Sequence, residues 1–503
     1  MAEQGQKQCV RGGWRQQKSR RSGQWALPML WLWLLVLAAM QTARAQAVPQ
    51  FTSPAAARAW GEARARAWGE ARARAGQYQA AGLAFLQEAD AYARRGDPQG
   101  AEAERRRARR LLTDLAIGIT VPVSAPSRLA KLEPPAGCWL GVLDQTPDGR
   151  LGNADDLSRR LGRSVGVAFN YARYGEPFPM GWARAEAQRG RLVQIAWEPQ
   201  EGLGEVQDNA YLNQWARDAS QCGTGVFLRF AGEMNGGWTR WGRNPVAYRR
   251  AFRLVHAVVA RQAPNVALVW APNAVPLSNV DAYYPGDDAV DWVGISLYLV
   301  RFYDDNLSRP AWRDAPNAFI DPFYAKYAAR KPLCLVECGI TRRSRVEGAD
   351  ADLFAAARIA DLFDALRVRY PRLKMACWFD RNNLTGATPA RRLNDYSLPR
   401  GSLALSAFQS ATADPYFLGS VGERAPLAYA RVGSRLPLGY AGPLIFSLSS
   451  YALDSFLAVA QGGRQARLAR PFRAFATPGH GPLRVRVVDR QGRVAATTLL
   501  AAP

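Results

Sequence analysis

Residues 226–270 read VFLRFAGEMNGGWTRWGRNPVAYRRAFRLVHAVVARQAPNVALVW. This stretch begins with a short apolar run, continues through a polar loop rich in Gly, and ends with a second apolar run. Between the two runs, Phe252, Val255 and Val259 recur at the spacing of one helix face. The pattern predicts a strand, a helix over 246–262 and a second strand, which together form a β-α-β unit.

The same unit repeats across residues 136–400. Strands that are buried on both faces of a parallel sheet have nearly continuous apolar sequences, and eight such runs alternate here with amphipathic stretches such as 350–369. The repeat predicts an α/β fold, a (β/α)8 TIM barrel, with a doubly wound open sheet as the alternative. No Gly-rich phosphate-binding motif follows the first run, which disfavours the open sheet. The runs are 138–143, 165–170, 192–197, 226–230, 266–270, 292–298, 333–336 and 375–379.

The segments on either side of the barrel have different patterns. Residues 46–121 are rich in Arg and Ala and predict a helical hairpin, which 122–135 links to the barrel. Residues 410–503 contain short apolar runs separated by Gly and Pro, which predict a small β-sandwich accessory domain. Within it, the runs 485–488 and 494–499 predict a β-hairpin.

Residues 1–45 have the order of a secretory signal peptide. A basic polar segment precedes the apolar run 25–40, and Ala43-Arg44-Ala45 offers a cleavage site with small residues. The apolar run is short for a membrane span, so we expect cleavage and a secreted or periplasmic protein. If the run is not cleaved, the alternative is a membrane-anchored protein.

The charge of the chain is strongly positive but unevenly distributed. The 503 residues carry a net charge of +24, which first suggests a nucleic-acid partner. Residues 131–400, however, hold 35 basic and 29 acidic side chains, so the predicted barrel is nearly balanced. We therefore expect no nucleic-acid binding, and the basic ends favour an association with an anionic cell envelope.

Histidine and cysteine usage argues against a metal or another cofactor. The chain has two His, His256 and His480, which leaves too few for a His-based metal site or a Ser-His-Asp triad in the barrel. Its six Cys lack metal-ligand spacing and lie mostly in apolar runs, which predicts buried small residues.

Two carboxylates, Glu233 and Glu337, follow apolar runs where the catalytic groups of a barrel lie. A charge at such a position is costly unless it has a partner or a function. Strand alternation places Glu233 on the face of Arg229, and Glu337 on the face of Leu333 and Leu335. The alternative to a catalytic pair is a structural ion pair between Glu233 and Arg229.

A pair of carboxyl groups among aromatic side chains is what glycosidic hydrolysis requires. One group donates a proton to the leaving oxygen, and the other stays ionised and attacks the anomeric carbon. Trp238 and Trp241 follow the run 226–230, and Trp378 lies in the last run, 375–379; their rings can stack on the apolar faces of sugars.

The segment Arg229 to Gly242 resembles the acid/base segment of glycoside hydrolase family 26, the β-mannanase family. Residues 270–273 and 284–296 resemble the next two strands of that family, and 336–339 resembles its nucleophile strand. The resemblance covers roughly residues 137–385, with the segments in the same order.

The resemblance implies a retaining mechanism, with Glu233 as acid/base and Glu337 as nucleophile. Their carboxyl groups should then lie about 5–5.5 Å apart. Tyr298 would orient the nucleophile, and Trp378 would floor the sugar subsite at the cleavage point. The other substrate-binding residues would be Trp238, Trp241, Asn273 and Arg229.

Two departures from the family pattern bear on specificity. The family usually has His before the acid/base Glu, where this chain has Gly232, and often an aromatic residue at the position of Cys338. The missing His contributes to the sugar subsite of the family, so mannan specificity is open.

The sequence thus predicts an exported, endo-acting glycoside hydrolase. Its substrate would be a mannan-type or another β-linked polysaccharide, and the enzyme would need no metal or cofactor. The alternative is a non-catalytic polysaccharide-binding or scaffold protein of an exopolysaccharide or cell-envelope system. Sugar, linkage and oligomeric state are left open.

Overall fold

The computed structural model describes residues 116–500 with gaps. The signal-peptide prediction and nearly all of the predicted helical hairpin lie outside the described residues. No helix among the described residues is both long and apolar enough to cross a membrane. The gaps are 124–127, 147–148, 310, 312–313, 349, 426–427, 432–442, 450–455, 462–463, 469–472, 476–482 and 489–493.

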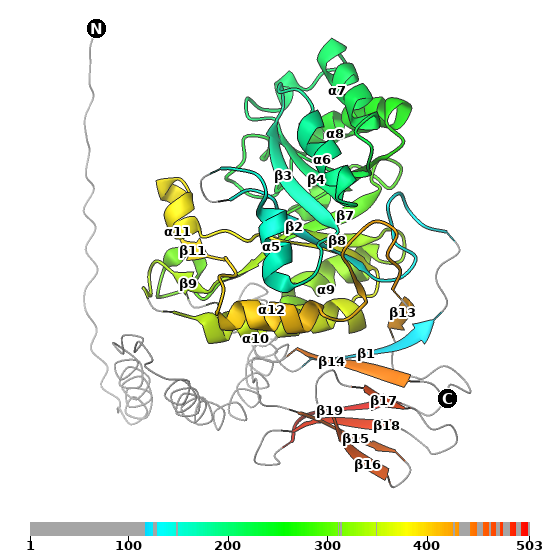
Figure 1. Cartoon of the computed structure of the whole chain (residues 1–503), viewed down its shortest axis with the longest axis vertical. Coiled ribbons are helices and arrows are strands. Elements are labelled where there is room, and N and C mark those ends of the chain that lie inside the picture. The colour runs from blue at the N-terminus through cyan, green and yellow to red at the C-terminus, as the bar shows by residue number, and fades with distance from the viewer. Residues whose placement is uncertain are drawn as a thin grey trace, which may run out of the picture. The chain divides into compact units, whose positions relative to one another are not determined.

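Eight parallel strands form a closed barrel (Figure 1). Each strand pairs with the next one along the chain, and the last barrel strand returns to pair with the first, Met375 opposite Trp139. This closure confirms the predicted (β/α)8 barrel and excludes the open sheet. The strands are β2 (Cys138–Leu143), β3 (Val167–Arg173), β4 (Leu192–Glu198), β5 (Val226–Phe230), β6 (Val266–Trp270), β7 (Trp292–Leu299), β8 (Leu333–Ile340) and β10 (Leu373–Trp378).

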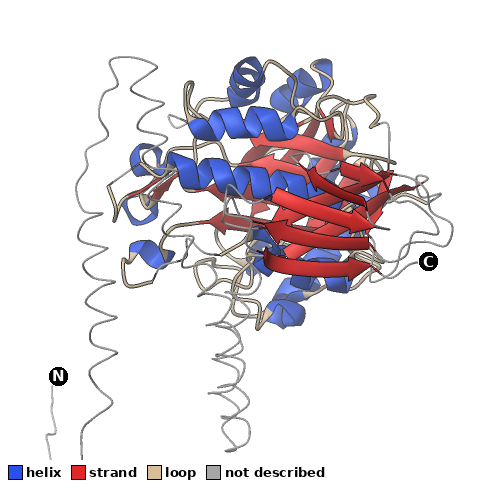
Figure 2. Cartoon of the chain, turned by 90° about the horizontal axis from the view of Figure 1, so that it is seen from below, coloured by secondary structure: helices blue, strands red, loops and turns tan. Residues whose placement is uncertain are grey.

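Helices flank the barrel strands (Figure 2). Helix α8 begins where the Asn244 side chain accepts a hydrogen bond from the Ala247 amide, and Pro245 occupies the first turn. Its buried residues include Phe252, Val255 and Val259, the predicted face. The helices are α5 (Asn153–Leu161), α6 (Met180–Gln188), α7 (Ala210–Ser220), α8 (Pro245–Gln262), α9 (Pro316–Tyr327), α10 (Asp352–Val368), α11 (Asn383–Gly386) and α12 (Leu403–Thr412).

The buried side chains form two clusters, one inside the barrel and one between the strands and the helices. Along β4, Gln194 and Ala196 face the interior, and Ile195 and Trp197 pack in the outer cluster. All five described cysteines are free and buried, as predicted for small apolar residues.

The barrel extends beyond its predicted end at residue 400. Helix α12 packs on α10, and β12 (Phe417–Leu418) pairs in parallel with β2. Residues 410–418 therefore belong to the barrel and not to the accessory domain. The apolar Phe408 and Phe417 explain this boundary, because both rings pack on Phe363 of α10.

The remaining described strands form two four-stranded antiparallel sheets and one small pair. The order is β13-β1-β14-β17 in one sheet and β16-β15-β18-β19 in the other, so residues 116–121 form a strand rather than part of a helical hairpin. The predicted hairpin is confirmed as β18 paired with β19. A sandwich packing of the two sheets stays a prediction. The strands are β1 (Ala116–Val123), β9 (Arg343–Ser344), β11 (Asn394–Asp395), β13 (Ala428–Arg431), β14 (Pro443–Ser449), β15 (Phe456–Gln461), β16 (Arg464–Leu468), β17 (Arg473–Phe475), β18 (Leu483–Val488) and β19 (Val494–Leu500).

Candidate active site

Glu337 of β8 lies at the centre of a polar cluster at the carboxyl end of the barrel. The residue is 6% exposed. Oxygen Oε2 accepts hydrogen bonds from the Tyr171 hydroxyl at 2.7 Å and from Arg229, and Oε1 accepts one from the Tyr298 hydroxyl. These three donors, from β3, β5 and β7, stabilise the negative charge of the carboxylate.

A β-bulge in β8 turns Glu337 towards this cluster. Ile295 of β7 pairs with Leu335, but the next residue, Ser296, pairs with Glu337, so Val336 is extra. The predicted shared face of Glu337 and Leu335 is therefore wrong, because Leu335 packs outside the barrel and the bulge reverses the alternation before Glu337. The side chain of Gln194 donates to the Val336 carbonyl at 2.7 Å across the interior.

The two tyrosines beside Glu337 are held in their protonated form. Burial, together with the negative charge of Glu337, raises the pKa of Tyr171 and the pKa of Tyr298 well above the ordinary value. Both hydroxyl groups therefore remain donors to the carboxylate across the pH range in which proteins work.

Glu233 lies in the loop that follows β5, which ends at Phe230. Its backbone has a φ of 58°, a left-handed conformation that is uncommon for a residue other than Gly and that is often found at functional sites. The side chain is partly exposed. Its carboxylate accepts hydrogen bonds from Trp238 Nε1 at 2.8 Å and from Asn273 Nδ2 at 3.2 Å.

Arg229 links the two carboxylates. It is 3% exposed, and its Nη1 contacts Glu337 while its Nη2 lies 3.5 Å from Glu233 and donates to Ser296 Oγ at 2.9 Å. Burial alone would lower the pKa of Arg229, but the charges of Glu337 and Glu233 outweigh it and raise the pKa. The predicted ion pair between Glu233 and Arg229 is therefore confirmed, and it also includes Glu337.

The absence of a side chain at Gly232 makes room for this arginine. A Cβ atom at position 232 would lie 2.5 Å from Arg229 Nε and 3.1 Å from Cζ. Because the guanidinium group is held by Glu337, Ser296 and Glu233, it cannot move aside without loss of these contacts.

The two tryptophans of the loop have different environments. Trp238 is 53% exposed and presents its ring to solvent beside Glu233. Trp241 is buried, and its Nε1 donates to the Gly232 carbonyl at 2.7 Å. Trp238 therefore offers a surface for stacking, whereas Trp241 braces the loop.

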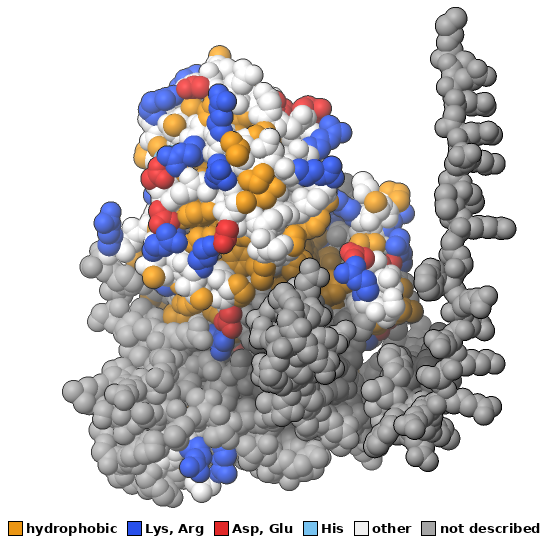
Figure 3. Space-filling view, turned by 180° about the vertical axis from the view of Figure 1, so that it is seen from behind, with side chains coloured by type: hydrophobic (Ala, Val, Ile, Leu, Met, Phe, Trp, Pro, Cys, Tyr) orange, Lys and Arg blue, Asp and Glu red, His pale blue; other side chains and the backbone are white. Residues whose placement is uncertain are grey.

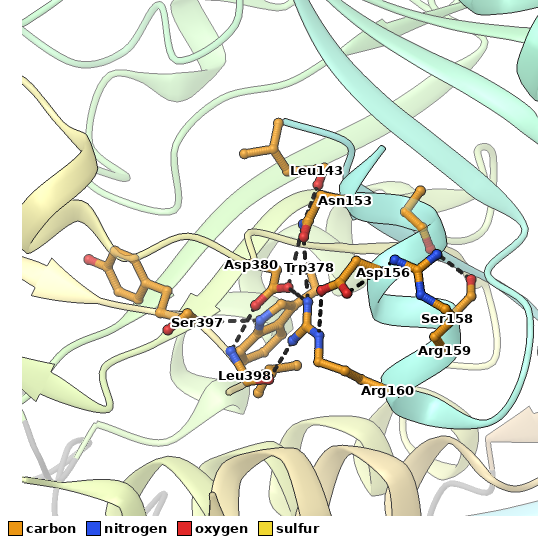
Figure 4. Close-up of polar contacts among 12 residues, drawn as sticks. Leu143, Asn153, Asp156, Ser158, Arg159, Arg160, Trp378, Asp380, Ser397 and Leu398 are labelled. Atoms are coloured by element: carbon orange, nitrogen blue, oxygen red, sulfur yellow. Dashed lines mark hydrogen bonds and ion pairs between the residues drawn. The ribbon is translucent and has the colours of Figure 1, made fainter. Parts of the chain in front are cut away.

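Trp378 has no exposed surface on which a sugar could stack, contrary to the subsite role that the sequence predicts for it. It is fully buried, packs against Phe408 of α12 and donates to the Tyr396 carbonyl at 3.1 Å. Figure 4 shows it beside Asp380, which pairs with Arg160 of α5. The next residue, Phe379, faces the interior instead, where its ring meets that of Tyr298.

Several residues of the cluster were not among the predicted site residues. Tyr171 lies two residues after the interior Phe169 on the same strand, so alternation places it on the interior face. Ser296 is a polar residue inside an apolar strand. Both features are visible in the sequence and could have indicated these residues. Glu198, at the end of β4, carried the same signal as Glu337. Among the described residues, no group of acidic, His and Cys side chains has the arrangement of a metal site.

Part of the chain that holds this cluster is similar to known proteins. Residues 204–309, which include Glu233 and Tyr298, match the model of glycosyl hydrolase family 26. Endoglucanase H of Acetivibrio thermocellus is 24% identical over 294 residues, which cover 55% of this chain and 30% of that protein. Beta-1,3-xylanase TXYA of a Vibrio species is 31% identical over 137 residues, which cover 23% of this chain and 29% of that protein.

Among solved structures, a family 26 β-mannanase from Bacteroides ovatus aligns with a TM-score of 0.40 and 16% identity. The alignment covers 57% of this chain and 91% of that structure. The chain spans less than a third of the length of the two curated relatives named above. The match over residues 204–309 confirms the resemblance of this barrel to glycoside hydrolase family 26.

Proposed function

We propose that this protein is a retaining glycoside hydrolase that cleaves a β-linked polysaccharide. One observation carries the proposal: a buried Glu337 with three donors and a more exposed Glu233 contact the same guanidinium group. The two carboxyl groups thus lie close together in different environments, which is how a pair of carboxyls divides the acid and nucleophile roles.

In this mechanism Glu337 is the nucleophile. Arg229, Tyr171 and Tyr298 donate hydrogen bonds to its carboxylate and fix its orientation, as attack on an anomeric carbon requires. When the glycosyl-enzyme bond forms, Glu337 loses its negative charge. The three donors stay in place and donate to the carboxylate again once hydrolysis has released it.

Glu233 is the acid/base. It lies at the more open side of the cluster, where a leaving sugar and then a water molecule can reach it. Trp238 and Asn273 hold one oxygen each, which fixes the orientation of the carboxyl group. In its protonated form it donates to the leaving oxygen, and as a carboxylate it then activates the water.

For the substrate we propose a mannan-type polymer cut internally, with mixed-linkage β-glucan and β-1,3-xylan as the alternatives. The mannan proposal rests on the family resemblance of the sequence. The alternatives come from the relatives, an endoglucanase and a β-1,3-xylanase. The exposed ring of Trp238 beside Glu233 suits any of these polymers, because stacking on a sugar face does not depend on one hydroxyl configuration.

Reducing-sugar release from the three polymers tests the proposal. We expect the full chain to cleave at least one of them, and Glu233→Ala and Glu337→Ala each to lower the rate by roughly a thousandfold or more. The matched control is Glu176→Ala, since Glu176 is an exposed glutamate on the loop after β3 and should leave the rate unchanged.

Unchanged release by either site variant would contradict the assignment. Retention of the polymers without any release would favour the second sequence hypothesis, a non-catalytic polysaccharide-binding protein.

A further inference from the structure

Glu198 is a third carboxyl group at the mouth of the barrel, and the mechanism above does not use it. It is the last residue of β4. Strand alternation places its side chain on the same face as Gln194 and Ala196, which is the interior face. The side chain is partly buried. Among the described residues its carboxylate has one hydrogen bond, from Gln200 Nε2 at 2.6 Å, and no ion pair.

The charged groups around Glu198 come from several elements. Glu337 and Glu233 face it with negative charge, and Arg229 and Arg391 with positive charge. Tyr171 of β3 also interacts with it. Burial and the two glutamates together outweigh the arginines and raise the pKa of Glu198 to about 7.

The arginines do not neutralise Glu198 by contact. Both terminal nitrogens of Arg229 are already engaged by Glu337, Ser296 and Glu233, and Arg391 is an exposed side chain. A partly buried carboxyl without a cationic partner costs stability, and such groups with perturbed protonation cluster at functional sites.

We propose that Glu198 binds a sugar hydroxyl group of the substrate as a neutral carboxylic acid, and that its ionisation weakens substrate binding. This rests on the proposed function of the same site. As an acid, Glu198 presents one O–H donor and one carbonyl acceptor, which match the two roles of a hydroxyl group. When ionised, it loses the donor and adds a third negative charge beside Glu233 and Glu337.

The pH dependence of kcat/KM tests this proposal. We expect kcat/KM of the full chain to fall about tenfold per pH unit above about pH 7. Glu198→Gln keeps a neutral group of the same shape, so its decline should begin at least one pH unit higher, with kcat/KM near pH 6 within about fivefold. Glu201→Gln is the matched control, because Glu201 lies on the same loop and is exposed, and it should leave the profile unchanged.

The direction of the change separates the proposal from the alternatives. If Glu233 limits the alkaline side and Glu198 is an ionised neighbour, removal of that charge moves the decline to lower pH. A shift to lower pH, an unchanged profile or a uniform loss of activity at every pH in Glu198→Gln would each overturn the proposal.

A binding measurement distinguishes this proposal from the proposed function. Affinity electrophoresis in gels with mannan, mixed-linkage β-glucan or β-1,3-xylan needs no turnover. We expect retardation of the wild-type chain to be stronger near pH 6 than near pH 8.5, and that of Glu198→Gln to be the same at both. If a chain without activity gives this result, the proposed hydrolase function is rejected and the proposed role of Glu198 in binding is supported. Equal retardation of both chains at both pH values, or no retardation, would overturn the proposed role of Glu198.

Discussion

Arg229 is the residue on which the geometry of the active site depends. A single buried guanidinium group contacts Glu337, Glu233 and Ser296, so it fixes the separation of the two carboxyl groups. Its position in turn requires Gly232, because a Cβ atom there would overlap Arg229 Nε. Gly232 is thus a structural requirement of this arginine conformation.

Gly232→Ala tests this dependence. The added methyl group should displace the Arg229 guanidinium and weaken its charge-assisted bond to Glu337, each such bond being worth about 1.5–3 kcal/mol. We expect kcat to fall about 10- to 100-fold while the fold is kept. Steady-state kinetics and far-UV circular dichroism measure the two effects. A kcat equal to that of the wild type would show that Arg229 does not need this space.

At this scale the sequence indicated the charged residues better than the aromatic ones. Glu233 and Glu337 follow apolar runs and Arg229 lies inside one, and a charge at such a position stands out in the sequence. Trp378 ends β10 and Phe379 follows it directly, and the run they belong to is apolar on both faces, so no alternation tells which one faces inward. The structure places Phe379 inside and Trp378 outside.

The bulge of β8 is the element that orients Glu337, the proposed nucleophile. Val336 is the extra residue of the bulge, and the Gln194 side chain of β4 donates a hydrogen bond to its carbonyl from across the barrel. Gln194 is fully buried among apolar side chains. A bulge inside an apolar run cannot be recognised from the sequence. The face of the strand on which Glu337 lies could therefore not be predicted from alternation.

We expect Gln194→Leu to lower kcat about tenfold or more with a smaller change in KM, because the bulge would lose its anchor and Glu337 its orientation. The unpaired Val336 carbonyl should also lower the free energy of unfolding by about 1–3 kcal/mol. Kinetics and urea unfolding measure these changes. Thr224→Val serves as a control, since Thr224 Oγ1 bonds the Arg191 carbonyl away from the predicted site residues.

A loss of stability in Gln194→Leu without any loss of kcat would limit Gln194 to a structural role. In that case the orientation of Glu337 would depend on its own three donors alone.

At the scale of the whole molecule, the barrel was predictable because its eight strands are buried on both faces and its helices on one. The observed bounds of β2, β5 and β6 coincide with the predicted runs. The boundary at residue 400 was less predictable, because α12 and β12 join the barrel through tertiary contacts that no local pattern records.

The barrel carries charged side chains of both signs. Lys and Arg side chains are interspersed with Asp and Glu side chains on the face shown in Figure 3. This mixture matches the near balance of residues 131–400 within a chain of net charge +24.

The central claim is that Glu337 and Glu233 form a retaining catalytic pair. Azide rescue of the two alanine variants tests it most directly, with an aryl β-glycoside of the polymer that the wild-type chain cuts and product configuration read by proton NMR. Glu337→Ala should give the α-glycosyl azide, since azide enters the space of the nucleophile, and Glu233→Ala should give the β-glycosyl azide by attack on the covalent intermediate. The reverse assignment of the two products, or rescue of neither variant, would contradict the account.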